Sequence, residues 1–258
     1  MQAKLKPSEL SYLLRTLGAE KAVGVNNAAL FPADEAARDA LLAQGFAALQ
    51  EDGWLVKQNG SFATNADVML LTAVIAAPEF TIMLTSNLPD GKRQTITYYQ
   101  AQGIIVEQLY TSEEQYLLTR LDSLGEVIER LCLALGIPQE QLEQETAVTL
   151  NTEAFEQAVE QAKSGNPSSL TNLLAAAGLP AAEAGQLAAR IPRLRPAGNV
   201  EIAAFAGGQV RGLNNIIALK ETDETAWTIL PGSQPETIIF QTVDAPSFSR
   251  LIRRAVDS

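Results

Sequence analysis

Apolar positions along the chain follow two patterns, and these patterns alternate in blocks. In some blocks they recur every three or four residues, which predicts amphipathic helices, whereas in others they alternate with polar positions, which predicts strands with one buried face. In the first half, the helical spacing predicts helices at residues 8–17, 34–50, 65–76 and 123–135. Alternation predicts four strands within residues 79–121, the first of which carries Phe80 and Ile82.

Turn and cap residues mark the ends of these elements. The dipeptide Asn59-Gly60 favours a hairpin turn of type I′, and the Pro-Asp-Gly run at residues 89–91 favours a second turn between strands. Asn65 is a suitable N-cap for the helix that follows it. Helices, strands and turns therefore succeed one another without a long unstructured segment in the first half.

The second half shows the same succession of elements. Its predicted helices lie at residues 152–162, 167–178 and 180–191, its strands around 200–202, 213–219, 227–230 and 238–243, and its closing helix carries Phe248, Leu251, Ile252 and Ala255. Residues 116–122 match residues 238–244 in one register, from a strand through an Asp to a helix. Elsewhere the register between the halves shifts only in predicted turns, where insertions are tolerated. We therefore predict an internal repeat.

These elements together predict an α+β fold with a quasi-two-fold internal repeat. Each half is expected to contain a helical block, a mostly antiparallel four-stranded sheet and a closing helix. Residues 1–138 would form the N-terminal half and residues 151–258 the C-terminal half. Residues 139–150, which are rich in Glu and Gln, are the expected linker.

The amino-acid composition mainly excludes certain kinds of catalytic and metal site. Of the 258 residues, 47% are hydrophobic and 19% are charged, which is typical of a globular protein. The chain has no histidine and a single cysteine, Cys132, which we interpret as a small buried apolar residue. Histidine-based catalysis, histidine metal ligands, a cysteine zinc site and an intrachain disulfide are thereby excluded. The glycine-rich nucleotide motifs are also absent. We expect no catalytic residue, no metal and no cofactor.

Charge disfavours nucleic acid as a partner. The formal net charge is −11, whereas phosphate contacts need a basic surface. Residues 8–63 have the helix, helix, hairpin order of a winged helix, but acidic residues slightly outnumber basic ones there. A winged-helix regulator is therefore the weakest hypothesis that we retain.

Nothing near the N-terminus resembles a targeting signal. Pro7, Ser8 and Glu9 follow the first lysines where a signal peptide would have an apolar run. The longest apolar stretches, such as residues 69–77, are too short to cross a bilayer. We expect a cytoplasmic protein without membrane insertion.

Two sets of residues are candidates for a functional site. Asp122 and Asp244 occupy equivalent positions of the repeat, and they form either a symmetric polar site or two helix N-caps. Leucines in the second helical block, among many alanines, could line a groove for an amphipathic partner helix or could form an internal core. These leucines are Leu170, Leu173, Leu174, Leu179 and Leu187.

The order of elements resembles that of a known family. The segments that carry the resemblance are the helices 8–18 and 34–50, Gly53-Trp54-Leu55, the helix end near Pro78, the strand pair around Gly91, residues 186–190 (QLAAR), the strand pair around Gly208 and residues 227–231 (WTILP). Together they are similar to the EspG family of cytoplasmic chaperones associated with type VII (ESX) secretion.

This resemblance implies a non-enzymatic protein with a quasi-two-fold α/β fold that binds secreted helical hairpins of the PE–PPE kind. The turn at residues 88–93 departs from the family, whose members often carry a longer, client-binding loop at this point. The identity of the client is therefore open. A small-molecule-binding protein or enzyme with a pocket between the two halves remains the alternative.

Overall fold

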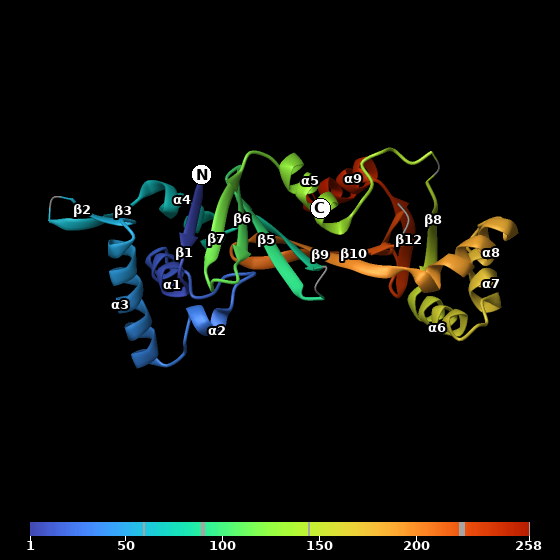
Figure 1. Ribbon diagram of the computed structural model, residues 1–258, viewed down its shortest axis with the longest axis horizontal. Coiled ribbons are helices and arrows are strands. Elements are labelled where there is room, and N and C mark those ends of the chain that lie inside the picture. The colour runs from blue at the N-terminus through green and yellow to red at the C-terminus, as the bar shows by residue number, and fades with distance from the viewer. Residues whose placement is uncertain (59, 89–90, 144, 222–224, 258) are drawn as a thin grey trace. The chain divides into compact units, whose positions relative to one another are not determined.

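A computed structural model describes residues 1–58, 60–88, 91–143, 145–221 and 225–257 of the protein (Figure 1). Helices within these residues are α1 (Pro7–Thr16), α2 (Asn27–Leu30), α3 (Glu35–Glu51), α4 (Ala66–Ala76), α5 (Leu124–Leu135), α6 (Thr152–Lys163), α7 (Ser168–Ala176), α8 (Ala181–Arg190) and α9 (Ala245–Val256). Strands are β1 (Gln2–Leu5), β2 (Leu55–Gln58), β3 (Ser61–Thr64), β4 (Phe80–Asn87), β5 (Arg93–Ala101), β6 (Ile104–Tyr110), β7 (Tyr116–Leu121), β8 (Ala147–Asn151), β9 (Arg195–Ala206), β10 (Gln209–Lys220), β11 (Ala226–Pro231) and β12 (Thr237–Val243).

Ten of these strands form one sheet, whose order is β1-β7-β6-β5-β4-β9-β10-β11-β12-β8. Strand β7 pairs antiparallel with β1 and β6, and β12 pairs antiparallel with β8 and β11. Strands β2 and β3 form a separate hairpin. Helices beside a largely antiparallel sheet confirm the predicted α+β class.

Contacts group the chain into two compact units. Unit 1 consists of Met1–Leu84, Thr95–Val127 and Ile202–Leu213, and unit 2 consists of Thr85–Gln94, Ile128–Glu201 and Asn214–Ser258. Unit 1 therefore takes residues 202–213 from the C-terminal sequence half, and unit 2 takes residues 85–94 and 128–138 from the N-terminal half. The internal repeat stays a prediction, to be tested by superposing residues 67–135 on residues 182–256.

The core of unit 1 lies between its helices and its strands. Leu10, Leu13 and Leu14 of α1 are fully buried, as the helical spacing predicts, and they pack in one cluster with residues of α4, β1, β6 and β7. Gly45 of α3 lies so close to α1 that an added Cβ atom would collide with the carbonyl oxygen of Ser8. Glycine at this position therefore allows α1 and α3 to pack closely.

The core of unit 2 is built on an aromatic pair. Trp227 of β11 and Phe240 of β12 stack with their ring centroids 4.7 Å apart. Apolar residues of α6, α7, α8 and β8 pack around this pair in one cluster. The helical block predicted for the second half thus covers one face of its strands, which positions the leucines discussed below.

Three elements differ from the sequence-based expectation. Strands β1 and β8 and the short helix α2 were not predicted, so the sheet has ten strands instead of two sets of four. Strand β8 occupies the end of the expected linker at residues 139–150, and the backbone N–H of Thr146 donates to Oγ1 of Thr242 at 2.9 Å. The predicted turn residues Asn59, Pro89 and Asp90 lie outside the described residues.

Of the two aspartates at equivalent positions of the predicted repeat, Asp122 and Asp244, one acts as a helix N-cap through its side chain. Asp244 caps α9, since its carboxylate accepts from the backbone N–H of Ser247 at 2.7 Å and of Leu142 at 2.9 Å. At the other junction the cap is Ser123, whose Oγ accepts from the N–H of Glu126 at 3.2 Å. Asp122 contributes its own backbone N–H, which donates to the Glu126 carboxylate. The predicted cap at Asp244 is therefore confirmed, and of the two caps that the sequence allows for α5, Asp122 or Ser123, the structure shows Ser123.

Candidate functional site

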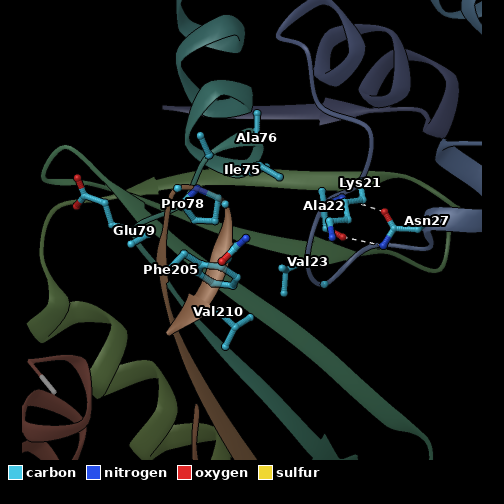
Figure 2. Close-up of a pocket in the computed structure, with 16 residues that line it drawn as sticks. Lys21, Ala22, Val23, Asn27, Ile75, Ala76, Pro78, Glu79, Phe205 and Val210 are labelled. Carbon is cyan, nitrogen blue, oxygen red and sulfur yellow. Dashed lines mark hydrogen bonds between the residues drawn. The ribbon is translucent and has the colours of Figure 1, made fainter. Parts of the chain in front are cut away.

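Unit 1 contains a pocket of about 820 Å³ that is formed by three segments (Figure 2). The first is residues 21–24 with Asn27, the second is the C-terminal end of α4 with residues 77–79, and the third is the β9–β10 turn from Phe205 to Val210. All three belong to unit 1. We call this cavity the α4 pocket.

Hydrogen bonds hold the first wall of the α4 pocket in place. The Asn27 side chain accepts from the N–H of Ala22 at 2.9 Å and donates to the carbonyl oxygen of Ala22 at 2.8 Å, as the dashed lines in Figure 2 show. The buried hydroxyl of Tyr99 donates to the carbonyl oxygen of Val23 at 2.6 Å. Gly24 has a φ of +70°, and a Cβ atom there would collide with the side chains of Thr97 and Tyr99. The loop is therefore fixed against the sheet.

The third wall is a tight glycine turn. Gly207 and Gly208 have positive φ angles of 58° and 75°, which confirms the turn predicted from this dipeptide. The backbone N–H of Phe205 donates to the carbonyl oxygen of Glu79 at 2.8 Å, which ties the third wall to the second. Two segments more than a hundred residues apart in sequence are thus joined at the pocket.

The lining of the α4 pocket is chiefly apolar and small. Ile75, Pro78, Phe205 and Val210 supply the larger apolar side chains, and Val210 leaves 60% of its surface exposed. No hydroxyl or thiol side chain is among the described residues of the lining. The lining can receive apolar side chains of a partner, and apolar residues exposed beside a cavity are typical of interaction sites.

Charge at the α4 pocket is confined to its two sides. Figure 2 shows Glu79 and Lys21 on opposite sides of the cavity, with the end of α4 above it. The C-terminal carbonyl groups of a helix carry a partial negative charge. The side formed by α4 and Glu79 is therefore negative and the side of Lys21 is positive.

The five predicted partner-binding leucines all lie in the helical block of unit 2. Leu170 and Leu174 are fully buried, and Leu187 is 6% exposed. Leu173 and Leu179 are partly buried and pack against the same cluster. The structure thus brings the five together, but as part of the core; Leu173 and Leu179 retain the most surface for a partner. Their role in partner binding stays a prediction.

Leu179 and Leu187 also line a smaller cavity of about 370 Å³ in unit 2. Trp227 of β11 and Glu183 and Arg190 of α8 are among its other lining residues. Nε of Arg190 donates to the carboxylate of Glu221 at 2.8 Å, so the charge of this arginine is already paired. Because most of its lining residues are polar, this cavity offers less apolar surface to a partner than the α4 pocket.

Cys132 is buried in α5, as the sequence predicts. Burial raises the pKa of its thiol to about 11, which leaves the thiol protonated at neutral pH. Within the described ranges, no three His, Cys, Asp or Glu side chains are grouped as metal ligands would be. None of the described helices is both long and apolar enough to span a bilayer.

Comparisons with known proteins bear on the fold. No protein-family model matches the chain, and no curated protein matches it. Among solved structures, the chain has the fold of a type VII secretion chaperone. One of the matching structures is the Mycobacterium tuberculosis chaperone EspG5 in complex with a PE25–PPE41 dimer. Its TM-score is 0.64 and its identity is 12%, and 100% of this chain and 96% of that chain are covered. The predicted resemblance to EspG proteins is therefore confirmed for the fold.

Proposed function

We propose that the protein is a non-enzymatic binding protein that holds a helical protein client, in the way that a secretion chaperone does. The observation that carries the proposal is the likeness to EspG5 over the full length of this chain, because that structure contains a bound PE25–PPE41 dimer. The chemistry of the α4 pocket agrees with this role, since its lining is chiefly apolar. The client would be a secreted helical hairpin, held in the cytoplasm.

The α4 pocket is the surface that we assign to the client. Its apolar floor can receive side chains from one face of an amphipathic helix. The exposed Val210 extends this floor beyond the cavity. Burying a valine side chain stabilises a complex by about 1.5–3 kcal/mol, so an aspartate at this position should weaken binding at least tenfold.

The test uses defined clients. The purified full-length protein is mixed with a panel of purified PE–PPE heterodimers that includes PE25–PPE41, and complexes are detected by size-exclusion chromatography with light scattering. We expect a stable complex with at least one dimer and its loss in Val210→Asp. Leu133→Asp is the matched control, because Leu133 is 82% exposed on α5 and lines none of the cavities described above. No complex with any dimer would refute the proposed client class.

A small-molecule ligand is the second candidate function. The volume of the α4 pocket falls in the range of small-molecule sites, about 300–1,000 Å³. The pocket lies within unit 1, and its lining takes residues 21–79 from the N-terminal sequence half and residues 205–210 from the C-terminal half. A melting-temperature screen against metabolites tests it, because a ligand that binds the native state raises the melting temperature. A shift of several degrees with one compound, abolished in Val210→Asp, would favour this function over client binding.

A further inference from the structure

The first part of β10 lacks a partner strand on one side. In the order of the sheet, β10 lies between β9 and β11, but β11 pairs only with residues 217–220 of β10. Residues 209–213 therefore have β9 on one side and none of the described strands on the other. They belong to unit 1, in which they form the outermost strand. We call this segment the β10 edge.

The turn between β9 and β10 fixes which backbone groups pair. The N–H of Phe205 donates to the carbonyl oxygen of Glu79, directly before β4, so Phe205 directs its backbone groups to β4. The next residue of β9, Ala206, then directs its groups to β10, because successive residues of a strand bond to opposite sides. Ala206 and Gln209 flank the two-residue turn at Gly207-Gly208, so they lie opposite each other and bond to each other.

The same alternation shows which groups of the β10 edge are open. Gln209, Arg211 and Leu213 direct their backbone groups to β9, whereas Val210 and Gly212 direct theirs away from it. No described loop or helix bonds to the backbone of Val210 or Gly212. The N–H and C=O groups of these two residues therefore form a template on which an extended chain can add as a further strand.

One face of the β10 edge continues the apolar lining of the α4 pocket. Val210 lies opposite Phe205 in the hairpin, and both residues line this pocket, as Figure 2 shows. Val210 leaves 60% of its surface exposed. At Gly212, an added Cβ atom would meet only the Cβ of Ala204, at 4.0 Å. An added strand can therefore place one apolar side chain beside Val210 and a larger one over Gly212.

The other face of the β10 edge carries a positive charge. Arg211 is exposed and forms no ion pair with a described residue, and Leu213 on the same face is 62% exposed. An acidic residue directly opposite Arg211 is favourable. A second copy of this chain, paired two-fold along the β10 edge, would place the two Arg211 side chains opposite or diagonally opposite each other, where like charges repel. The charge therefore favours an acidic segment of another protein over a second copy.

We propose that the β10 edge binds an extended polypeptide segment as an additional antiparallel strand, with an acidic residue opposite Arg211 and apolar residues opposite Val210 and Gly212. Backbone hydrogen bonds to Val210 and Gly212 hold the segment, and its side chains set the preference. The residue opposite Val210 extends the apolar row that begins at Phe205. This inference goes beyond the proposed client, because an extended peptide alone tests it and the PE–PPE panel tests the client separately.

The test is an NMR titration of the ¹⁵N-labelled full-length protein with the peptide acetyl-Ile-Tyr-Glu-Val-Thr-amide. In antiparallel pairing its glutamate lies opposite Arg211, its tyrosine opposite Gly212 and its valine opposite Val210. Without peptide, we expect the amide protons of Val210 and Gly212 to exchange quickly with solvent and that of Arg211 slowly. Saturating peptide should slow the exchange at Val210 and Gly212.

Two variants at Gly212 separate strand addition from general apolar attraction. Gly212→Pro removes the N–H that points away from β9 and leaves the pairing with β9 intact, since proline is accepted at an open strand edge. Gly212→Ala is the matched control, because it keeps this N–H and its Cβ has room. We expect Gly212→Pro to bind the peptide at least about threefold more weakly than Gly212→Ala, with equal stability in urea denaturation.

A charge exchange tests the preference for an acidic segment. Arg211→Glu should weaken binding of the peptide by about two- to fivefold, and a peptide with lysine in place of glutamate should regain this loss. The proposal is overturned if no peptide binds up to about 10 mM, if Gly212→Pro binds as well as Gly212→Ala, or if the charge exchange has no effect. A concentration-dependent dimer that Gly212→Pro abolishes would also overturn it, because a second copy would then occupy the edge.

Discussion

Replacing Tyr99 by phenylalanine tests how the first wall of the α4 pocket is held. The Tyr99 side chain has no exposed surface. Its hydroxyl donates a bifurcated hydrogen bond to the carbonyl oxygen of Val23 at 2.6 Å and to Oε1 of Gln108 at 2.9 Å. Phenylalanine keeps the ring and removes the hydroxyl. Both oxygens would then lose their donor, and Gln108 is 2% exposed, so water cannot easily replace it.

The expected magnitude follows from these contacts. The lost hydrogen bonding is worth about 0.5–1.5 kcal/mol, and leaving a buried acceptor without a donor costs about 1–3 kcal/mol. Tyr99→Phe should therefore lower the free energy of unfolding by about 2–4 kcal/mol. For a chain of this size that corresponds to a melting temperature lower by roughly 5–15 °C. Burial raises the pKa of Tyr99, so the hydroxyl stays protonated and this contribution persists across the neutral range.

Urea denaturation measures the change, and hydrogen exchange locates it. We expect the amide protons around Val23 and Gly24 to exchange faster in Tyr99→Phe than in the wild type. The matched control is Tyr110→Phe, because Tyr110 is 47% exposed and should change stability by less than about 0.5 kcal/mol. If Tyr99→Phe is as stable as this control, the hydroxyl does not hold the loop and the reasoning is wrong.

Three further predictions concern titratable groups. Burial raises the pKa of Glu9, so the native state loses stability as the pH rises through that pKa. In urea denaturation, Glu9→Gln should therefore be as stable as the wild type near about pH 4 and more stable than the wild type at pH 7. Burial opposes ionisation of Asp244, but the hydrogen bonds from Ser247 and Leu142 outweigh it and lower its pKa. Asp244→Ala should therefore lower the free energy of unfolding by about 1–2 kcal/mol at pH 7, an effect that fades as the pH falls through the lowered pKa and is absent below it. Cys132, whose pKa is raised to about 11 by burial, should react with iodoacetamide at neutral pH only after unfolding, as mass spectrometry would show.

The sequence predicts helices best where spacing and caps agree. Asn65 accepts hydrogen bonds from the N–H groups of Asp67 and Val68, and α4 begins at the next residue, as expected from the sequence. Strands β1 and β8 have four and five residues, too few for alternation to stand out from their neighbours. Their pairing depends on β7 and β12, which lie far away in the sequence.

The spacing of apolar residues could not predict the α4 pocket either, because the pocket also depends on segments that lie far apart in the sequence. Leu170 and Leu174 have the spacing of an apolar face, but spacing does not distinguish a face that packs internally from one that is open to a partner. The α4 pocket joins Lys21 to Val210, and neither residue stands out in its local sequence. The Gly207-Gly208 turn was recognisable, but its place beside the end of α4 depends on the tertiary fold.

Residues 202–213 complete unit 1, although the rest of that unit ends at Val127. A ribosome adds about 5–20 residues per second, so the nascent unit 1 waits roughly ten seconds for its last segment. During that interval the α4 pocket lacks Phe205 and Val210, and the apolar residues of α4 beneath them are uncovered. If the pocket binds a client as proposed, it can do so only after nearly the whole chain has been translated.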